Sequence, residues 1–219
     1  MSTTTRWWWI RHAPVVEQVG RLYGQTDLAC DTSDTAALKA LAAILPKGAL
    51  WVTSHLRRTG DTARAIATNG IDASPPIVEP DLAEQHFGAW QGMTWDEIRA
   101  AHEEASQEFW KDPTGNAPPG GESFAHVVAR AGAVIKRLTT ANSGRDMVCV
   151  AHAGSIRAAL ALALDLDPWK GLAVQIDNLS LTRVEHVPER LDMGHASAWR
   201  VVTVNQPLVA DLSERMAAS

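Results

Sequence analysis

The sequence predicts a three-layer α/β/α domain built on a mainly parallel central sheet, with a small cap insertion. Two observations lead to this class. Short apolar runs rich in Val, Ile and Trp alternate along the chain with longer helix-like segments. The runs are too short for typical helices and lack a polar side, as expected of parallel strands that helices cover on both faces.

The expected strands fall into two groups. Three apolar runs are typical of strands buried on both faces: 5–11 (TRWWWIR), 49–54 (ALWVTS) and 146–152 (DMVCVAH). Two later runs, 178–187 and 197–204, alternate apolar and polar residues. We expect these two to pair with each other across the intervening loop.

The expected helices lie between and after these strands, and the last of them follows the third apolar run directly. They span residues 32–48, 57–70, 122–144 and 155–166. Ser33 or Asp34 is expected to cap the first helix. Gly48, Gly70 and Gly144 are well placed to end the first three.

The chain of 219 residues fits one domain, 1–219. We expect its core to consist of residues 5–87 and 122–205. Residues 88–121 break the alternation, because they contain a single helix at 94–110 followed by a loop rich in Pro and Gly. This segment is interpreted as an insertion that caps one end of the sheet.

Composition excludes several classes of function. The formal net charge is −5 and the chain has no Lys/Arg stripe, so a nucleic-acid partner is not expected. No apolar run reaches the length of a signal peptide or a membrane span, which predicts a cytoplasmic protein without membrane contact. Cys30 and Cys149 form no CxxC motif, which argues against a disulfide framework and a cysteine zinc site. The oligomeric state is left open.

Cationic and imidazole side chains follow the three buried runs. Arg11 and His12 end the first run, Arg57 and Arg58 follow the second, and His152 ends the third. Ligands of open α/β sheets bind outside the carboxyl ends of the strands, so we expect these groups to meet there. Two arginines beside two histidines suit a phosphoryl group, because a guanidinium supplies forked donors to its oxygens. The helix after His152 adds backbone N–H groups for the same anion.

Four motifs resemble the signatures of the histidine phosphatase superfamily, which includes the phosphoglycerate mutases. They are RHAP (11–14), SHLRRTGDTA (54–63), LAEQHFGAWQG (82–92) and AHAGSIR (151–157), in the order and spacing of the family. The resemblance covers about residues 5–205 and implies a phosphoglycerate mutase-like fold.

The resemblance also implies a role for each matching residue. His12 is the nucleophile that becomes phosphohistidine, and Glu84 is the proton donor to the leaving group. Arg11, Arg58 and His152 form the pocket for the substrate's phosphate, which inorganic phosphate or sulfate would also occupy. His152 is counted among the catalytic residues with His12 and Glu84.

Two further positions are assigned to the phosphate pocket. Gln18 stands where the family often has a phosphate-binding asparagine, and Gly154 opens the helix after the third strand. The chain departs from the commonest first motif, because Ala13 and Pro14 follow the histidine in place of Gly. The scheme requires no metal and no other cofactor.

The resemblance is closest to α-ribazole phosphatases, through GRLYGQTDLACD (20–31) and PPGGES (118–123). It implies a metal-independent phosphomonoesterase acting on a small phosphorylated metabolite, with α-ribazole 5′-phosphate as the candidate substrate. Few cations in the insertion favour a phosphatase over a mutase, and a substrate with one phosphate and an uncharged or aromatic remainder. Trp90, Trp95 and Trp110 could stack on that remainder, although roughly two of three such tryptophans belong to the core of a cap.

Four alternatives stay open at this point. Phosphoryl transfer of the mutase type is the first. A serine hydrolase would use Ser155, although the chain has no G-x-S-x-G elbow. A metal enzyme would draw on the eight histidines, although no HExxH is present. A binding module without turnover would be expected to have lost His12, Arg58 or His152, and all three are present.

Overall fold

The computed structural model describes residues 3–194 and 197–208, and in them six strands form one sheet in the order β3-β2-β4-β1-β5-β6. The strands are β1 (Thr5–Arg11), β2 (Leu50–Thr53), β3 (Ile77–Val78), β4 (Asp146–Ala151), β5 (Leu181–His186) and β6 (Trp199–Gln206). Strands β3, β2, β4 and β1 run parallel, whereas β5 and β6 are antiparallel to their neighbours. The predicted fold class is confirmed, as is the pairing of the two late strands.

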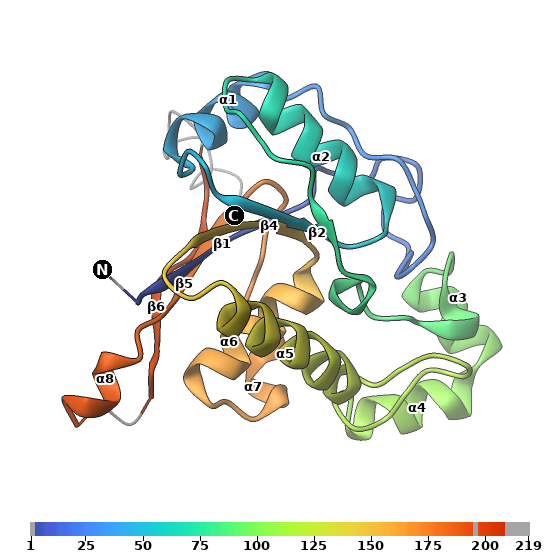
Figure 1. Ribbon diagram of the computed structural model, residues 1–219. Helices are drawn as coiled ribbons and strands as arrows, with labels where there is room; N and C mark the ends of the chain where they lie inside the picture. Colours follow the sequence, from blue (N-terminus) through green and yellow to red (C-terminus); the bar gives the residue numbers. More distant parts are fainter. Residues whose placement is uncertain (1–2, 195–196, 209–219) are drawn as a thin grey trace.

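Helices cover both faces of the sheet (Figure 1). Helices α1 (Thr35–Ile44) and α2 (Arg57–Thr68) pack on one face, and α5 (Phe124–Ala141) and α6 (Ala153–Leu164) on the other. Each face therefore has its own apolar core. No helix among the described residues is long and apolar enough to span a bilayer.

The three consecutive tryptophans of β1 divide between the two cores. Trp7 and Trp9 are fully buried on one face, with ring centroids 5.0 Å apart, because alternate residues of a strand point the same way. Trp8 points to the other face and is half-buried. Nε1 of Trp7 donates to Thr139 and Nε1 of Trp8 donates to Asp146. These contacts connect β1 to α5 and to β4.

The insertion differs from the expectation of one helix over 94–110. It contains two helices, α3 (Trp95–Ala101) and α4 (Glu103–Lys111), separated by His102 with φ −135° and ψ 47°. The break lets Ile98 of α3 and Phe109 of α4 pack against Trp90 in a small core. Packing therefore overrides a sequence pattern that would support one continuous helix.

Some element boundaries also shift. Helix α1 ends at Ile44, because Leu45 precedes Pro46 and adopts an extended conformation. Asp34 is its N-cap and accepts a hydrogen bond from Ala37 N. Helix α6 begins two residues earlier than expected, directly after His152. Five short elements were not predicted: β3, η1 (Pro80–Leu82), η2 (Gly88–Trp90), α7 (Pro168–Leu172) and α8 (Glu189–Asp192).

Candidate active site

Three neighbouring strands deliver the predicted groups to one edge of the sheet. The register pairs Arg11 of β1 with Ala151 of β4, and Thr53 of β2 with Val150 of β4. The residues that follow these strands, including His12 and His152, therefore emerge side by side. The ring centroids of the two histidines lie 5.2 Å apart.

His12 is 1% exposed and has a defined tautomer. Its Nδ1 lies 2.7 Å from the carbonyl oxygen of Ala13. Because a carbonyl oxygen can only accept, Nδ1 is the donor, and a neutral ring then has its lone pair on Nε2. Burial, with the positive charge of Arg58, lowers the pKa of His12 to about 3, so the ring is neutral at pH 7. Asn178 donates to the carbonyl of His12 and fixes the backbone.

His152 is fully buried, and its Nε2 lies 2.7 Å from the hydroxyl of Ser54. Its Nδ1 has no hydrogen-bond partner among the described residues. Burial, followed by the charges of His12 and Arg58, lowers its pKa well below the ordinary value. His152 therefore offers this site a neutral ring rather than a third positive charge.

Arg11 and Arg58 each have an N–H donor without a hydrogen-bond partner among the described residues. Arg58 is 0% exposed and uses two of its five N–H groups on the carbonyls of Gly24 and Thr26, at 2.6 and 2.9 Å. Arg11 donates to the carbonyl of Ile176 at 2.6 Å. The Nε atoms of both arginines are buried without a partner among the described residues. Buried donors of this kind are satisfied when an anion binds between them.

The structure distinguishes Arg58 from its neighbour in the sequence. The guanidinium of Arg58 lies over the ring of Tyr23, 5.2 Å from its centroid. Arg57 is exposed and pairs with Asp61 on the same helix. The choice of Arg58 by motif register therefore agrees with its position beside the two histidines.

Glu84 lies against the first turn of α6. Its Oε1 accepts from the backbone N–H of Gly154 at 3.1 Å and of Gln85 at 3.0 Å. A Cβ on Gly154 would lie only 2.3 Å from that oxygen. Glycine at 154 therefore makes room for the carboxylate, which explains this position better than flexibility does.

Sequence reasoning missed the residues that hold the Glu84 backbone in place. Nε2 of Gln25 and Nη2 of Arg130 both donate to the carbonyl of Glu84, at 2.9 and 3.1 Å. Arg130 pairs in turn with Glu122 at 2.8 Å. Burial acts to raise the pKa of Glu122, but Arg130 and the N–H of His86 outweigh it and keep the pKa low. The PPGGES motif contains Glu122, so a signal was present without an assigned role.

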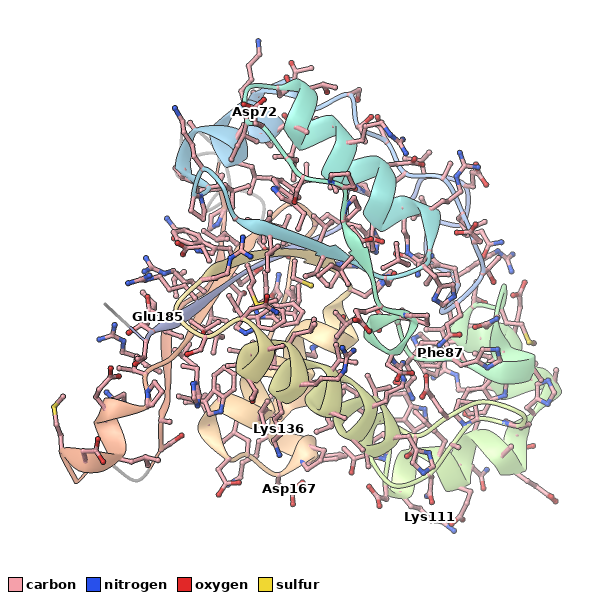
Figure 2. All side chains as sticks on the ribbon, viewed as in Figure 1. Asp72, Phe87, Lys111, Lys136, Asp167 and Glu185 are labelled. Carbon is pink, nitrogen blue, oxygen red and sulfur yellow. The ribbon has the colours of Figure 1, made fainter. Side chains whose placement is uncertain are left out.

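A cleft of about 650 Å³ opens beside these groups. Arg11, Glu84 and Gly154 are among the residues that line it. The wall is largely aromatic: Tyr23, Phe87 (labelled in Figure 2), Trp95, Phe109, Trp110, Phe124 and Trp169. Trp95 and Trp110 line the cleft, and their stacking on a substrate stays a prediction. Trp90 does not line the cleft, since it is fully buried in the core of the insertion.

Two other residues singled out from the sequence contact backbone groups. Gln18 belongs to a turn in which its carbonyl accepts from Arg21, and it does not line the cleft. Its assignment to the phosphate pocket stays a prediction. Ser155 is fully buried, and its hydroxyl bonds the backbone N–H and carbonyl of His152. Ser155 completes the capping box of α6, and among the described residues its hydroxyl bonds only to the backbone of His152 and to no imidazole or carboxylate base, so the serine hydrolase alternative has no support.

The family pattern of the histidine phosphatase superfamily (branch 1) matches residues 7–197, and the chain belongs to this family. It is a phosphoric monoester hydrolase, as its family and its named relatives show. It is 36% identical to the glucosyl-3-phosphoglycerate phosphatase of Mycolicibacterium vanbaalenii over an aligned length of 215 residues. The match covers 86% of this chain and 93% of that protein.

Solved structures of other phosphatases are similar to this chain. A mycobacterial glucosyl-3-phosphoglycerate phosphatase matches with a TM-score of 0.76 at 28% identity, covering 93% of this chain and 99% of that one. Its complex with inorganic phosphate matches with a TM-score of 0.72 at 26% identity and covers 93% of this chain and 98% of that one. Its complex with VO3 matches with a TM-score of 0.73 at 29% identity and covers 92% of this chain and 98% of that one. A putative α-ribazole-5′-P phosphatase from Escherichia coli has a TM-score of 0.79 at 19% identity, covering 93% and 98% of the two chains, and shares the fold.

Proposed function

We propose that the chain hydrolyses phosphomonoesters in two displacements through a phosphohistidine at His12. The observation that supports this most is the bond from Nδ1 of His12 to the carbonyl of Ala13, which leaves the lone pair on Nε2. Nε2 attacks the phosphorus, the P–O bond to the alcohol breaks, and the phosphoryl group is held on the ring. Water then attacks the phosphorus, the P–N bond breaks, and inorganic phosphate leaves.

Arg11, Arg58 and His152 would bind the phosphoryl oxygens during both displacements. Nε of Arg11, Nε of Arg58 and Nδ1 of His152 are buried without a partner among the described residues. This supports the role, because charge spreads over the phosphoryl oxygens in the transition state. The site is locally cationic in a chain of net charge −5, so attraction of the phosphate acts at short range. The steps need no metal.

Glu84 would act as the general acid in the first displacement and as the general base in the second. In its protonated form it gives the proton to the departing alcohol oxygen, and the resulting carboxylate then takes a proton from the attacking water. Its contact with Gly154, and the anchoring of its backbone by Arg130, support a fixed position beside the phosphate. Glu84 is half-buried and lines the cleft.

The cleft would hold the organic part of a small phosphorylated metabolite, with residues 88–121 as the cap of the single domain 1–219. Two substrates are candidates. Glucosyl-3-phosphoglycerate comes from the named relatives, and aromatic walls suit the faces of a sugar. α-Ribazole 5′-phosphate comes from the sequence motifs, and the same walls suit its aromatic base.

Brief incubation with a ³²P-labelled phosphomonoester tests the proposal. The wild type should retain an acid-labile, base-stable label, and His12→Ala should lose both label and at least about a thousandfold in kcat. His126→Ala removes an exposed histidine of α5 and serves as the matched control. A labelled and active His12→Ala would show that the nucleophile lies elsewhere. Release of inorganic phosphate, rather than an isomerised ester, separates hydrolysis from mutase transfer.

A further inference from the structure

Arg157 is a cleft residue to which the proposed hydrolysis gives no role. It lies one helical turn after Gly154 on α6, and it lines the same cleft as Arg11 and Glu84. Its Nε donates to the carbonyl of Val174 at 2.8 Å. Within residues 3–194 and 197–208, neither Nη atom has a hydrogen bond or an ion pair.

The charge of Arg157 is only partly compensated. Burial lowers its pKa, the positive charge of Arg11 acts in the same direction, and only Glu84 opposes them. Glu84 is engaged with the N–H of Gly154, and it must lose and regain a proton in each turnover. It cannot serve as a permanent partner. By contrast, Arg21, which also lines the cleft, is neutralised by Glu97 at 2.6 Å.

Apolar side chains from two neighbouring helices line the same cleft as Arg157. Phe124, Leu172 and Trp169 line the cleft on the side of α5 and α7, and α7 packs against α6 (Figure 1). A partly desolvated guanidinium gains more from an anion than an exposed one does, because the local dielectric is lower. Its planar fork matches the two oxygens of a carboxylate.

We propose that Arg157 is a specificity-determining residue that binds a carboxylate of the substrate, close to the phosphate ester. This inference rests on the proposed function and narrows its substrate class to phosphorylated hydroxy acids. A carboxylate fits better than a second phosphate, because one guanidinium beside the acidic Glu84 offers too little charge for a dianion. The inference revises the expectation of an uncharged remainder, and it favours a phosphoglycerate ester over α-ribazole phosphate, whose only anionic group is its phosphate.

Matched substrates test this directly. 3-Phosphoglycerate and glycerol 3-phosphate differ in having a carboxylate or a hydroxymethyl group, and phosphoserine and phosphoethanolamine differ in having a carboxylate or a hydrogen. The wild type should prefer the carboxylate member of each pair in kcat/KM. In Arg157→Leu that preference should fall about ten- to a hundredfold, the range for a charged hydrogen bond, and Arg157→Lys should restore part of it. Where turnover is slow, inhibition of p-nitrophenyl phosphate hydrolysis by each pair gives the same ratio.

Arg64→Leu is the charge-matched control, because Arg64 is an exposed residue of α2 paired with Asp61. It should leave the preference unchanged. A wild type without preference, or an unchanged preference in Arg157→Leu, would overturn the proposal. Labelling of His12 by p-nitrophenyl phosphate reports separately on the phosphohistidine. If the wild type carries no label, the hydrolytic mechanism is refuted. If the wild type is labelled but Arg157→Leu keeps the carboxylate preference, only the role of Arg157 is refuted.

Discussion

Alanine at position 154 would press directly on the proposed proton donor. Its Cβ would lie 2.3 Å from Oε1 of Glu84 and 3.5 Å from the carboxyl carbon. Carbon–oxygen contacts settle at about 3.3 Å or more, so the carboxyl oxygen must retreat by about 1 Å. That oxygen is at the end of a flexible side chain, so the side chain can move without unfolding the protein. The same movement displaces the carboxyl group from the position that proton transfer requires.

Stability and activity should therefore respond in opposite directions. Gly154 is a helical residue of α6, where alanine is favoured over glycine by up to about 1 kcal/mol, so the Tm should be unchanged or slightly higher. A displacement of about 1 Å at a reacting group can cost about a hundredfold. The loss in kcat/KM of Gly154→Ala should approach that of Glu84→Gln on alkyl phosphates. It should be much smaller on p-nitrophenyl phosphate, whose phenolate leaves without protonation.

Both substrates and the Tm should be measured in parallel with Gly132→Ala. Gly132 is a buried residue of α5, and a Cβ there would meet no atom within 4 Å. This control should gain stability without losing activity. Wild-type turnover of alkyl phosphates by Gly154→Ala would refute the placement of Glu84 as general acid, and equal losses on both substrates would point to a distorted phosphate pocket.

Two further outcomes follow from the site. Arg58→Lys keeps the charge but cannot reach both backbone carbonyls and the phosphate, so vanadate should inhibit it about ten- to a hundredfold more weakly; inhibition at wild-type strength would contradict this. Because the pKa of His12 is about 3 in the folded chain and about 6.5 in the unfolded one, unfolding takes up a proton between these values. Stability should be complete above about pH 6.5 and fall by up to about 1.4 kcal/mol per unit as the pH drops. Thermal unfolding of His12→Gln should show a smaller loss of stability over the same pH range. The loss should not disappear, because the pKa of His152 is lowered in the folded chain as well. Equal pH dependence of stability in the wild type and in His12→Gln would refute the lowered pKa of His12.

Local patterns were sufficient for the framework of the fold. Apolar runs of six or seven residues identified β1, β2 and β4, because a strand covered on both faces has no polar side to interrupt the run. The polar residue that ends such a run must lie at the edge of the sheet. The amino-acid sequence alone was therefore enough to place Arg11, His12 and His152 together.

Long-range packing settled what these patterns left open. Trp90 and Trp95 lie five positions apart in the sequence, but the first is fully buried in the core of the insertion and the second lines the cleft. The break at His102 likewise depends on contacts between α3 and α4 rather than on helical propensity. Burial of this kind depends on which surfaces meet, and the local pattern of the chain does not encode that.

The roles of arginines show the same division. The motif containing Arg58 indicated a phosphate contact from sequence, because its spacing from the strand end is local. Arg130 had no such signal, because its role is defined by Glu122 and the carbonyl of Glu84. Arg157 stands in the motif AHAGSIR, but the motif alone gave it no role, and its position in the cleft is known only from the structure. A charge becomes informative when its neighbours are known, and those neighbours come from segments that only folding brings together.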